Sequence, residues 1–87
     1  MNKWYLYIVE CSDGSFYTGI TTDITRRLSE HNLKKGAKSL YGKLPVKLIY
    51  KEAYVDKISA AKRERDIKGW RRTKKLELIG STSLHSV

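Results

Sequence analysis

Arg27 and His31 stand four residues apart in a segment whose apolar positions recur at helical spacing. Side chains four apart on a helix are neighbours on its surface, so these two should lie together. An arginine there can hold a phosphate through two hydrogen bonds. A histidine beside it can bind the same anion or move a proton. The structural alternative is a half-buried histidine with a backbone partner.

Glu64 is the second candidate, a carboxylate placed between Ala60 and Ile67 in another segment of helical spacing. At about 100° per residue, the three side chains fall within an arc of about 60°. A carboxylate in an apolar arc is costly unless it is paired or bound to a metal. An ion pair with a nearby arginine and a metal site would both meet that cost.

Two of the six tyrosines, Tyr7 and Tyr17, flank a strong turn signal at Asp13-Gly14. Tyrosines in strands usually pack in the core with a satisfied hydroxyl. A two-residue turn would send these two side chains to opposite faces of the sheet. A three-residue loop beginning at Ser12, or a β-bulge, would place them on the same face, where both could serve one site.

The elements that must position these residues follow from periodicity and caps, and they predict an α+β domain of order β-β-α-β-α-α. Asp56 can cap the second helix, and Thr22 or Asp23 the first. The third strand should place alternating residues on one side, namely Val46, Leu48 and Tyr50. The predicted elements are strands at residues 4–10 and 15–21, a helix at 23–32, a loop at 33–45, a strand at 46–53, and helices at 57–70 and 73–79.

Length and composition bound the class of protein. The chain has 87 residues, of which 40% are hydrophobic, so we expect one domain at residues 1–80 and a flexible tail at 81–87. No apolar run approaches the roughly 20 residues of a membrane span, and the first residues do not form a secretory signal. One cysteine and two histidines exclude a Cys/His zinc finger. We expect a cytoplasmic monomer without a membrane partner.

The net charge of +9 points to a polyanion, with nucleic acid ahead of a membrane surface. Basic residues cluster at 34–43 and 57–75, and such clusters favour binding to phosphates through release of counterions. A solvated helix face or simple solubility is the alternative explanation. The side chains expected to contact nucleic acid are Lys34, Lys35, Lys38, Lys43, Lys62, Arg63, Lys68, Arg71 and Arg72.

Taken in order, these residues resemble the GIY-YIG nuclease superfamily, and within it the small stand-alone bacterial proteins of unassigned role. The resemblance covers about residues 3–79. It rests on Tyr5-Leu6-Tyr7, on Tyr17-Thr18-Gly19, on the Arg27 and His31 pair, and on Glu64 in a later helix. It implies a three-stranded antiparallel sheet flanked by helices, and metal-dependent hydrolysis of a phosphodiester.

The resemblance also implies a role for each matching residue. Glu64 matches the glutamate that binds one divalent cation, Mg²⁺ or Mn²⁺. Arg27 would stabilise charge on the phosphate, while either Tyr7 or His31 would activate the attacking water. The implied catalytic set is Tyr7, Tyr17, Arg27, His31 and Glu64, with Gly19 as the motif glycine beside the site.

The chain departs from the family pattern in three places. Tyr5 and Thr18 stand where the motif has glycine and isoleucine. Many members carry an asparagine after the glutamate, whereas the asparagines here, Asn2 and Asn32, both precede Glu64. The predicted function is a metal-dependent endonuclease that cleaves DNA with low sequence specificity. The alternatives are a non-catalytic nucleic-acid-binding module of the same fold and a basic RNA- or ribosome-associated protein.

Overall fold

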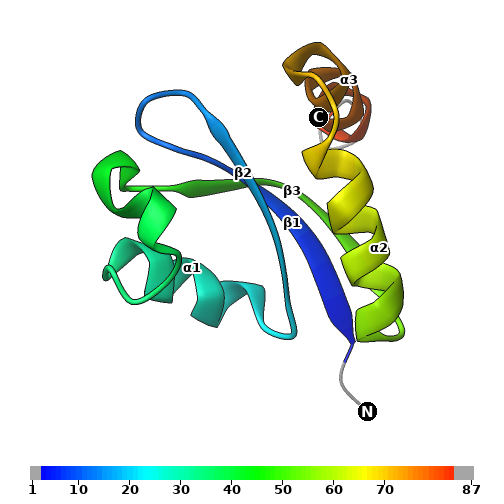
Figure 1. Cartoon of the computed structure of the whole chain (residues 1–87), viewed down its shortest axis with the longest axis horizontal. Helices are drawn as coiled ribbons and strands as arrows, with labels where there is room; N and C mark the ends of the chain where they lie inside the picture. Colours follow the sequence, from blue (N-terminus) through cyan, green and yellow to red (C-terminus); the bar gives the residue numbers. More distant parts are fainter. Residues whose placement is uncertain (1–2, 84–87) are drawn as a thin grey trace.

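The computed structural model describes residues 3–83 and contains one three-stranded antiparallel sheet of order β2-β1-β3 (Figure 1). The element order confirms the predicted α+β class and β-β-α-β-α-α succession, with one short 3-10 helix added. Within this part of the chain, no helix is long and apolar enough to cross a membrane. The elements are β1 (Trp4–Glu10), β2 (Phe16–Thr21), α1 (Ile24–Asn32), η1 (Lys38–Lys43), β3 (Lys47–Tyr54), α2 (Lys57–Lys68) and α3 (Arg72–Ser83).

Helices α1 and α2 cover opposite faces of the sheet (Figure 1). On the α1 face, Tyr7 and Val9 of the central strand pack against Leu28. On the α2 face, Leu6 and Ile8 pack against Ile67, which is fully buried. Strand β1 is therefore buried on both faces, which explains why its apolar residues occupy odd and even positions alike.

The hairpin loop has three residues, 12–14. Tyr7 pairs with Gly19, and the flanking Cys11 N–H donates to the carbonyl of Ser15 at 2.8 Å. Gly14 closes the loop with φ 84°, a left-handed conformation that glycine adopts without steric cost. The odd-numbered loop confirms the alternative in which Tyr7 and Tyr17 share one face.

The segment predicted as a loop, residues 33–45, contains the short helix η1. Its residue Leu40 is buried in the α1-side core, and this packing stabilises the helical turn. Helix α3 is longer than predicted and continues to Ser83, past the expected start of the tail at residue 81. Its residues Leu78 and Ile79 pack on the α2-side core. The rest of the predicted flexible tail, residues 84–87, lies outside the described residues.

The expectation that alternating residues of β3 share one side is wrong from Leu48 onward. Ile8 pairs with Tyr50 whereas the next residue, Val9, pairs with Leu48, so the register shifts between them. Ile49 is the extra residue of a β-bulge, which reverses the face of the sheet on which the following side chains lie. Leu48 therefore packs on the α1 side of the sheet and Tyr50 on the α2 side.

The Thr18 hydroxyl is the one buried side-chain polar atom in the described chain without a hydrogen-bond partner. An unsatisfied buried hydroxyl costs about 1–3 kcal/mol, so Thr18→Val should raise the free energy of unfolding by about 1 kcal/mol. Thr21→Val is the matched control, because the Thr21 hydroxyl accepts the Asp23 N–H at 3.1 Å and its removal should destabilise. Urea unfolding measures both, and a loss of stability in each variant would contradict this reading of Thr18.

Candidate active site

Tyr7 crosses from the central strand over the backbone of β2. A Cβ on its cross-strand partner Gly19 would lie 2.6 Å from Tyr7 Oη and 2.7 Å from Cζ. Real Cβ atoms essentially never approach within 3.0 Å of such neighbours, so only glycine leaves room for the ring. The motif glycine is thus needed at position 19 because the Tyr7 side chain packs directly against the β2 backbone there.

Tyr7, Tyr17 and His31 form a ring cluster on the α1 face. Tyr7 Oη lies 2.9 Å from His31 Nε2, and both side chains are about 1% exposed. The Tyr17 ring centroid lies 6.4 Å from that of Tyr7 and 5.6 Å from that of His31. Helix α1 brings His31 to this point, and Asp23 caps the helix by accepting the Arg26 N–H at 3.0 Å.

Arg27 lies beside the ring cluster with a third of its side chain exposed. Its Nη1 donates to Glu30 Oε1 at 3.0 Å, one helical turn further on. Burial, and next the neighbouring Tyr17, raise the pKa of Tyr7 to about 12, while hydrogen bonding and charge from Arg27 act in the opposite direction. Arg27 is therefore close enough to act on the Tyr7 hydroxyl and exposed enough to reach a phosphate.

Glu64 lies on α2, and its charge is the weakest of the influences that raise the pKa of Tyr7. The Glu64 side chain is 22% exposed, and its Oε2 lies 3.2 Å from Lys68 Nζ. Lys68 Nζ in turn lies 5.9 Å from the centroid of Tyr17. The partner of Glu64 is thus a lysine one turn along its own helix. The sequence predicts an arginine as this partner if Glu64 does not bind a metal.

The site is compatible with a divalent cation only if substrate helps to hold it. Among residues 3–83, no three His, Cys, Asp or Glu side chains gather to form a cage, and Glu64 offers one carboxylate. Mg²⁺ commonly keeps several waters and binds one or two carboxylates together with substrate phosphates. Glu64 fits that arrangement, provided that the half-exposed Lys68 ammonium moves aside.

A family model described as the GIY-YIG catalytic domain matches residues 3–77. The chain belongs to the GIY-YIG family. It is 49% identical over 79 residues to UPF0213 protein SSP2268 of Staphylococcus saprophyticus, covering 91% of this chain and 96% of that protein. It is 50% identical over 79 residues to UPF0213 protein HQ_3675A of Haloquadratum walsbyi, covering 90% and 89%.

Two solution NMR structures resemble this GIY-YIG domain. UPF0213 protein BH0048 of Bacillus halodurans matches with a TM-score of 0.59 at 42% identity, covering 90% of this chain and 83% of that one. Protein EF2693 of E. faecalis matches with a TM-score of 0.65 at 38% identity, covering 97% and 90%. Family membership supports a nuclease-like function on nucleic acid, whereas the names of these relatives state no activity.

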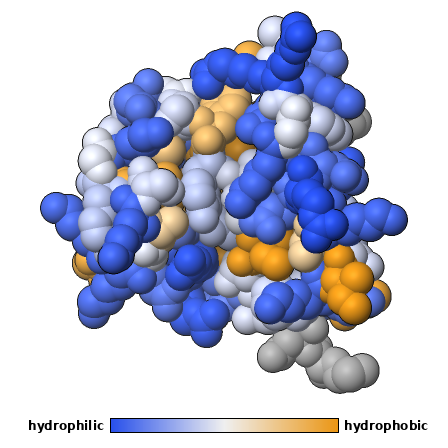
Figure 2. Space-filling model, viewed as in Figure 1, coloured by the Kyte–Doolittle hydropathy of each residue, from blue (hydrophilic) through white to orange (hydrophobic). Residues whose placement is uncertain are grey.

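Some of the cations expected to contact phosphates are already paired with carboxylates of the protein, and others are exposed without such a pair among the described residues. Arg63 donates to Glu52 from Nε at 3.0 Å and from Nη2 at 3.1 Å, so it is committed to the protein. Lys68 pairs with Glu64. Hydrophilic side chains cover most of the face seen in Figure 2. The predicted cations that are exposed are Lys34, Lys35, Lys38, Lys62, Arg71 and Arg72, and Lys43 is half-buried.

Glu52, on β3, is a carboxylate that sequence reasoning missed. Its side chain is 17% exposed, less than that of Glu64, and it accepts hydrogen bonds from Tyr50 and Tyr54 as well as Arg63. The signal was present in the alternation Tyr50-x-Glu52-x-Tyr54, which puts three polar groups on one side of a strand. Tyr50 packs in the α2-side core whereas Tyr7 belongs to the α1-side core, so this network lies on the other face of the sheet from the ring cluster.

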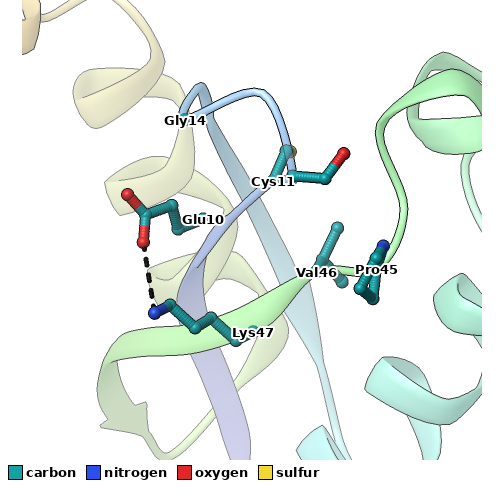
Figure 3. A pocket seen from close by; sticks show the side chains of 7 residues that line it. Glu10, Cys11, Gly14, Pro45, Val46 and Lys47 are labelled. Carbon is teal, nitrogen blue, oxygen red and sulfur yellow. Dashed lines mark ion pairs between the residues drawn. The ribbon is translucent and has the colours of Figure 1, made fainter.

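A hollow of about 420 Å³ lies at the C-terminal end of β1 (Figure 3). The end of β1, the hairpin loop and residues 45–47 line it, and Glu10 pairs with Lys47 at 3.6 Å beside it. Arg27 instead lines a smaller hollow of about 230 Å³, together with Arg26 and Glu30. Neither of these two hollows has Tyr7, Tyr17 or Glu64 among its lining residues.

His31 makes the domain sensitive to mild acid. Burial, and next the charge of Arg27, lower the pKa of His31 below its usual 6.5. At a pH between the pKa of His31 in the folded protein and its usual pKa of 6.5, the unfolded chain binds more protons than the folded protein. The contribution of neutral His31 to the free energy of unfolding is therefore complete above about pH 6.5 and is lost as pH falls through the folded-state pKa. We expect the free energy of unfolding to fall by up to about 1.4 kcal/mol per pH unit in that range.

Urea unfolding at a series of pH values measures this loss, and His31→Gln is the control that should flatten it. The described carboxyl groups with a lowered pKa have ordinary values of 3.8 or 4.5, so they contribute below this range. A wild-type stability that stays constant between about pH 7 and about pH 5 would contradict the buried, neutral state of His31.

Proposed function

We propose that the protein is a metal-dependent endonuclease that hydrolyses phosphodiester bonds in DNA with low sequence specificity. One observation carries the proposal, namely that Tyr7 contacts His31 and Tyr17 and lies within electrostatic reach of Arg27 and Glu64. These residues come from two strands and from helices on opposite faces of the sheet. The proposal is further supported by the exposure of a third of the Arg27 side chain beside this buried phenol, because a purely structural network would not need a cation that solvent can reach.

Each residue has a chemical task in this hypothesis. Arg27 binds the phosphate and stabilises the charge that develops on it. Tyr7 positions the attacking water and, in its phenolate form, accepts the proton of that water, and Tyr17 orients the water. A divalent cation held at Glu64 would polarise the phosphate and stabilise the leaving oxygen.

The exposed basic residues supply the binding surface for the polymer. The lysines near η1 and the arginines at the start of α3 are exposed cations, for example Lys38, Arg71 and Arg72. Contacts to phosphates fix the position of a nucleic acid without reading its bases, which is why low sequence specificity follows. Binding through such contacts weakens steeply with salt.

A cleavage assay on plasmid, branched and single-stranded DNA, with RNA of matched length, tests the function. We expect cleavage in Mg²⁺ or Mn²⁺, none in EDTA, and a rate that falls as salt rises. Salt-sensitive binding without cleavage in either metal would contradict the enzyme and support the non-catalytic module. Selective binding to RNA would support the third alternative.

One observation favours the non-catalytic module. Asn32 donates its Nδ2 to the carbonyl of Val46 at 3.2 Å and accepts the Val46 N–H at 2.8 Å. It therefore ties the end of α1 to the start of β3 and does not replace the asparagine that many family members carry after the glutamate. If cleavage is absent, this missing group is the first candidate cause.

A further inference from the structure

The backbone after α1 constrains which ring nitrogen of His31 carries the proton. The Ala37 N–H donates to His31 Nδ1 at 3.3 Å. A backbone amide can only donate, so Nδ1 must present its lone pair there. In a neutral imidazole the proton then resides on Nε2, the nitrogen that lies 2.9 Å from Tyr7 Oη.

Residues 34–37, which follow α1, fix the position of the His31 ring. A Cβ on Gly36 would lie 2.1 Å from His31 Nδ1, so no other residue type fits without moving the ring. Lys34, two residues after the end of α1, has φ 61°, and its N–H donates to the His31 carbonyl at 3.1 Å. The Lys35 N–H donates to the Glu30 carbonyl at 2.7 Å. These bonds fold residues 34–37 back against the last turn of α1.

We propose that Gly36 and Ala37 are positioning residues that hold neutral His31 in the Nε2–H tautomer, so that His31 donates to Tyr7 Oη. Neither ring nitrogen of His31 can then accept the proton of the attacking water. Nδ1 already accepts the Ala37 N–H, and Nε2 already carries a proton. The water must therefore give its proton to the Tyr7 phenolate, the form left once the hydroxyl proton has passed to solvent, and the His31 N–H donates to that oxygen. The catalytic part of this inference rests on the proposed function, whereas the tautomer does not.

Ring ¹⁵N chemical shifts of His31 test the tautomer directly in the wild-type protein. We expect a pyridine-like Nδ1 and a pyrrole-like Nε2 at about pH 7. The chain has two histidines, and a His85→Gln variant assigns the signals. The reverse pattern would overturn the proposal and leave the nuclease assay unaffected, while a correct tautomer without any cleavage would overturn only the proposed function.

Two changes test the positioning role. Gly36→Ala should displace His31 and lower the cleavage rate by about tenfold or more, while Gly42→Ala, where a Cβ would meet nothing within 4 Å, should leave it unchanged. Replacing the Ala37 amide by an ester in a synthetic chain removes only the donor, so it covers the case that Gly36→Ala fails to fold. The ester should shift the His31 signals toward the Nδ1–H tautomer, and unchanged signals would contradict the role of Ala37.

Discussion

Glu64→Gln should lower the cleavage rate by about 100-fold or more and change the free energy of unfolding by less than about 0.5 kcal/mol. Glutamine keeps the shape of the side chain but loses the charge that attracts a divalent cation. The ion pair with Lys68 is worth little to the fold, since the lysine is 53% exposed and the two residues are four apart on one helix. Initial rates on plasmid DNA in Mg²⁺ and urea unfolding measure the two effects.

Glu52→Gln is the matched control, and its expected effects are reversed. The substitution leaves the half-buried Arg63 without its carboxylate partner, so the free energy of unfolding should fall by about 2–3 kcal/mol. Because the Glu52 network packs with Tyr50 on the face of the sheet opposite the ring cluster, the cleavage rate of the folded protein should stay within about twofold of the wild type. Equal losses of rate in the two variants would contradict Glu64 as the metal-binding residue.

Tyr7→Phe should lower the cleavage rate by about 10²–10⁴-fold, the usual range for loss of a group that moves a proton. The ring and its packing over Gly19 remain, so the stability cost is the lost contact with His31 Nε2, about 1 kcal/mol. Single-turnover rates measured against pH separate the loss of chemistry from any loss of binding.

The wild-type rate should rise with pH, because burial raises the pKa of Tyr7 to about 12 and the phenolate fraction grows as pH approaches that value. Tyr7→Phe should abolish this dependence. Tyr54→Phe, which removes a hydroxyl that donates to Glu52, is the control and should retain both rate and slope. An undiminished rate in Tyr7→Phe would exclude Tyr7 as the proton acceptor.

Much of the fold was predictable because its signals are local. Asp56 caps α2 by accepting the Ser59 N–H at 2.8 Å, an interaction between residues three apart. The choice between Thr22 and Asp23 as the cap of α1 needed the structure, since either side chain could reach the same amides. The site residues Tyr7 and Glu64 were candidates from type and spacing, and the family resemblance named them as a set.

What the sequence by itself determined is therefore the order of the strands and α-helices, the cap of α2, and which residues are candidates for chemistry. Tertiary structure alone decided the partners. The odd number of residues in the hairpin loop put Tyr7 and Tyr17 on one face. The Ala37 amide met Nδ1 of His31. Each of these outcomes depends on where the chain folds back, and a side chain with several possible partners takes the one that packing brings within hydrogen-bonding distance.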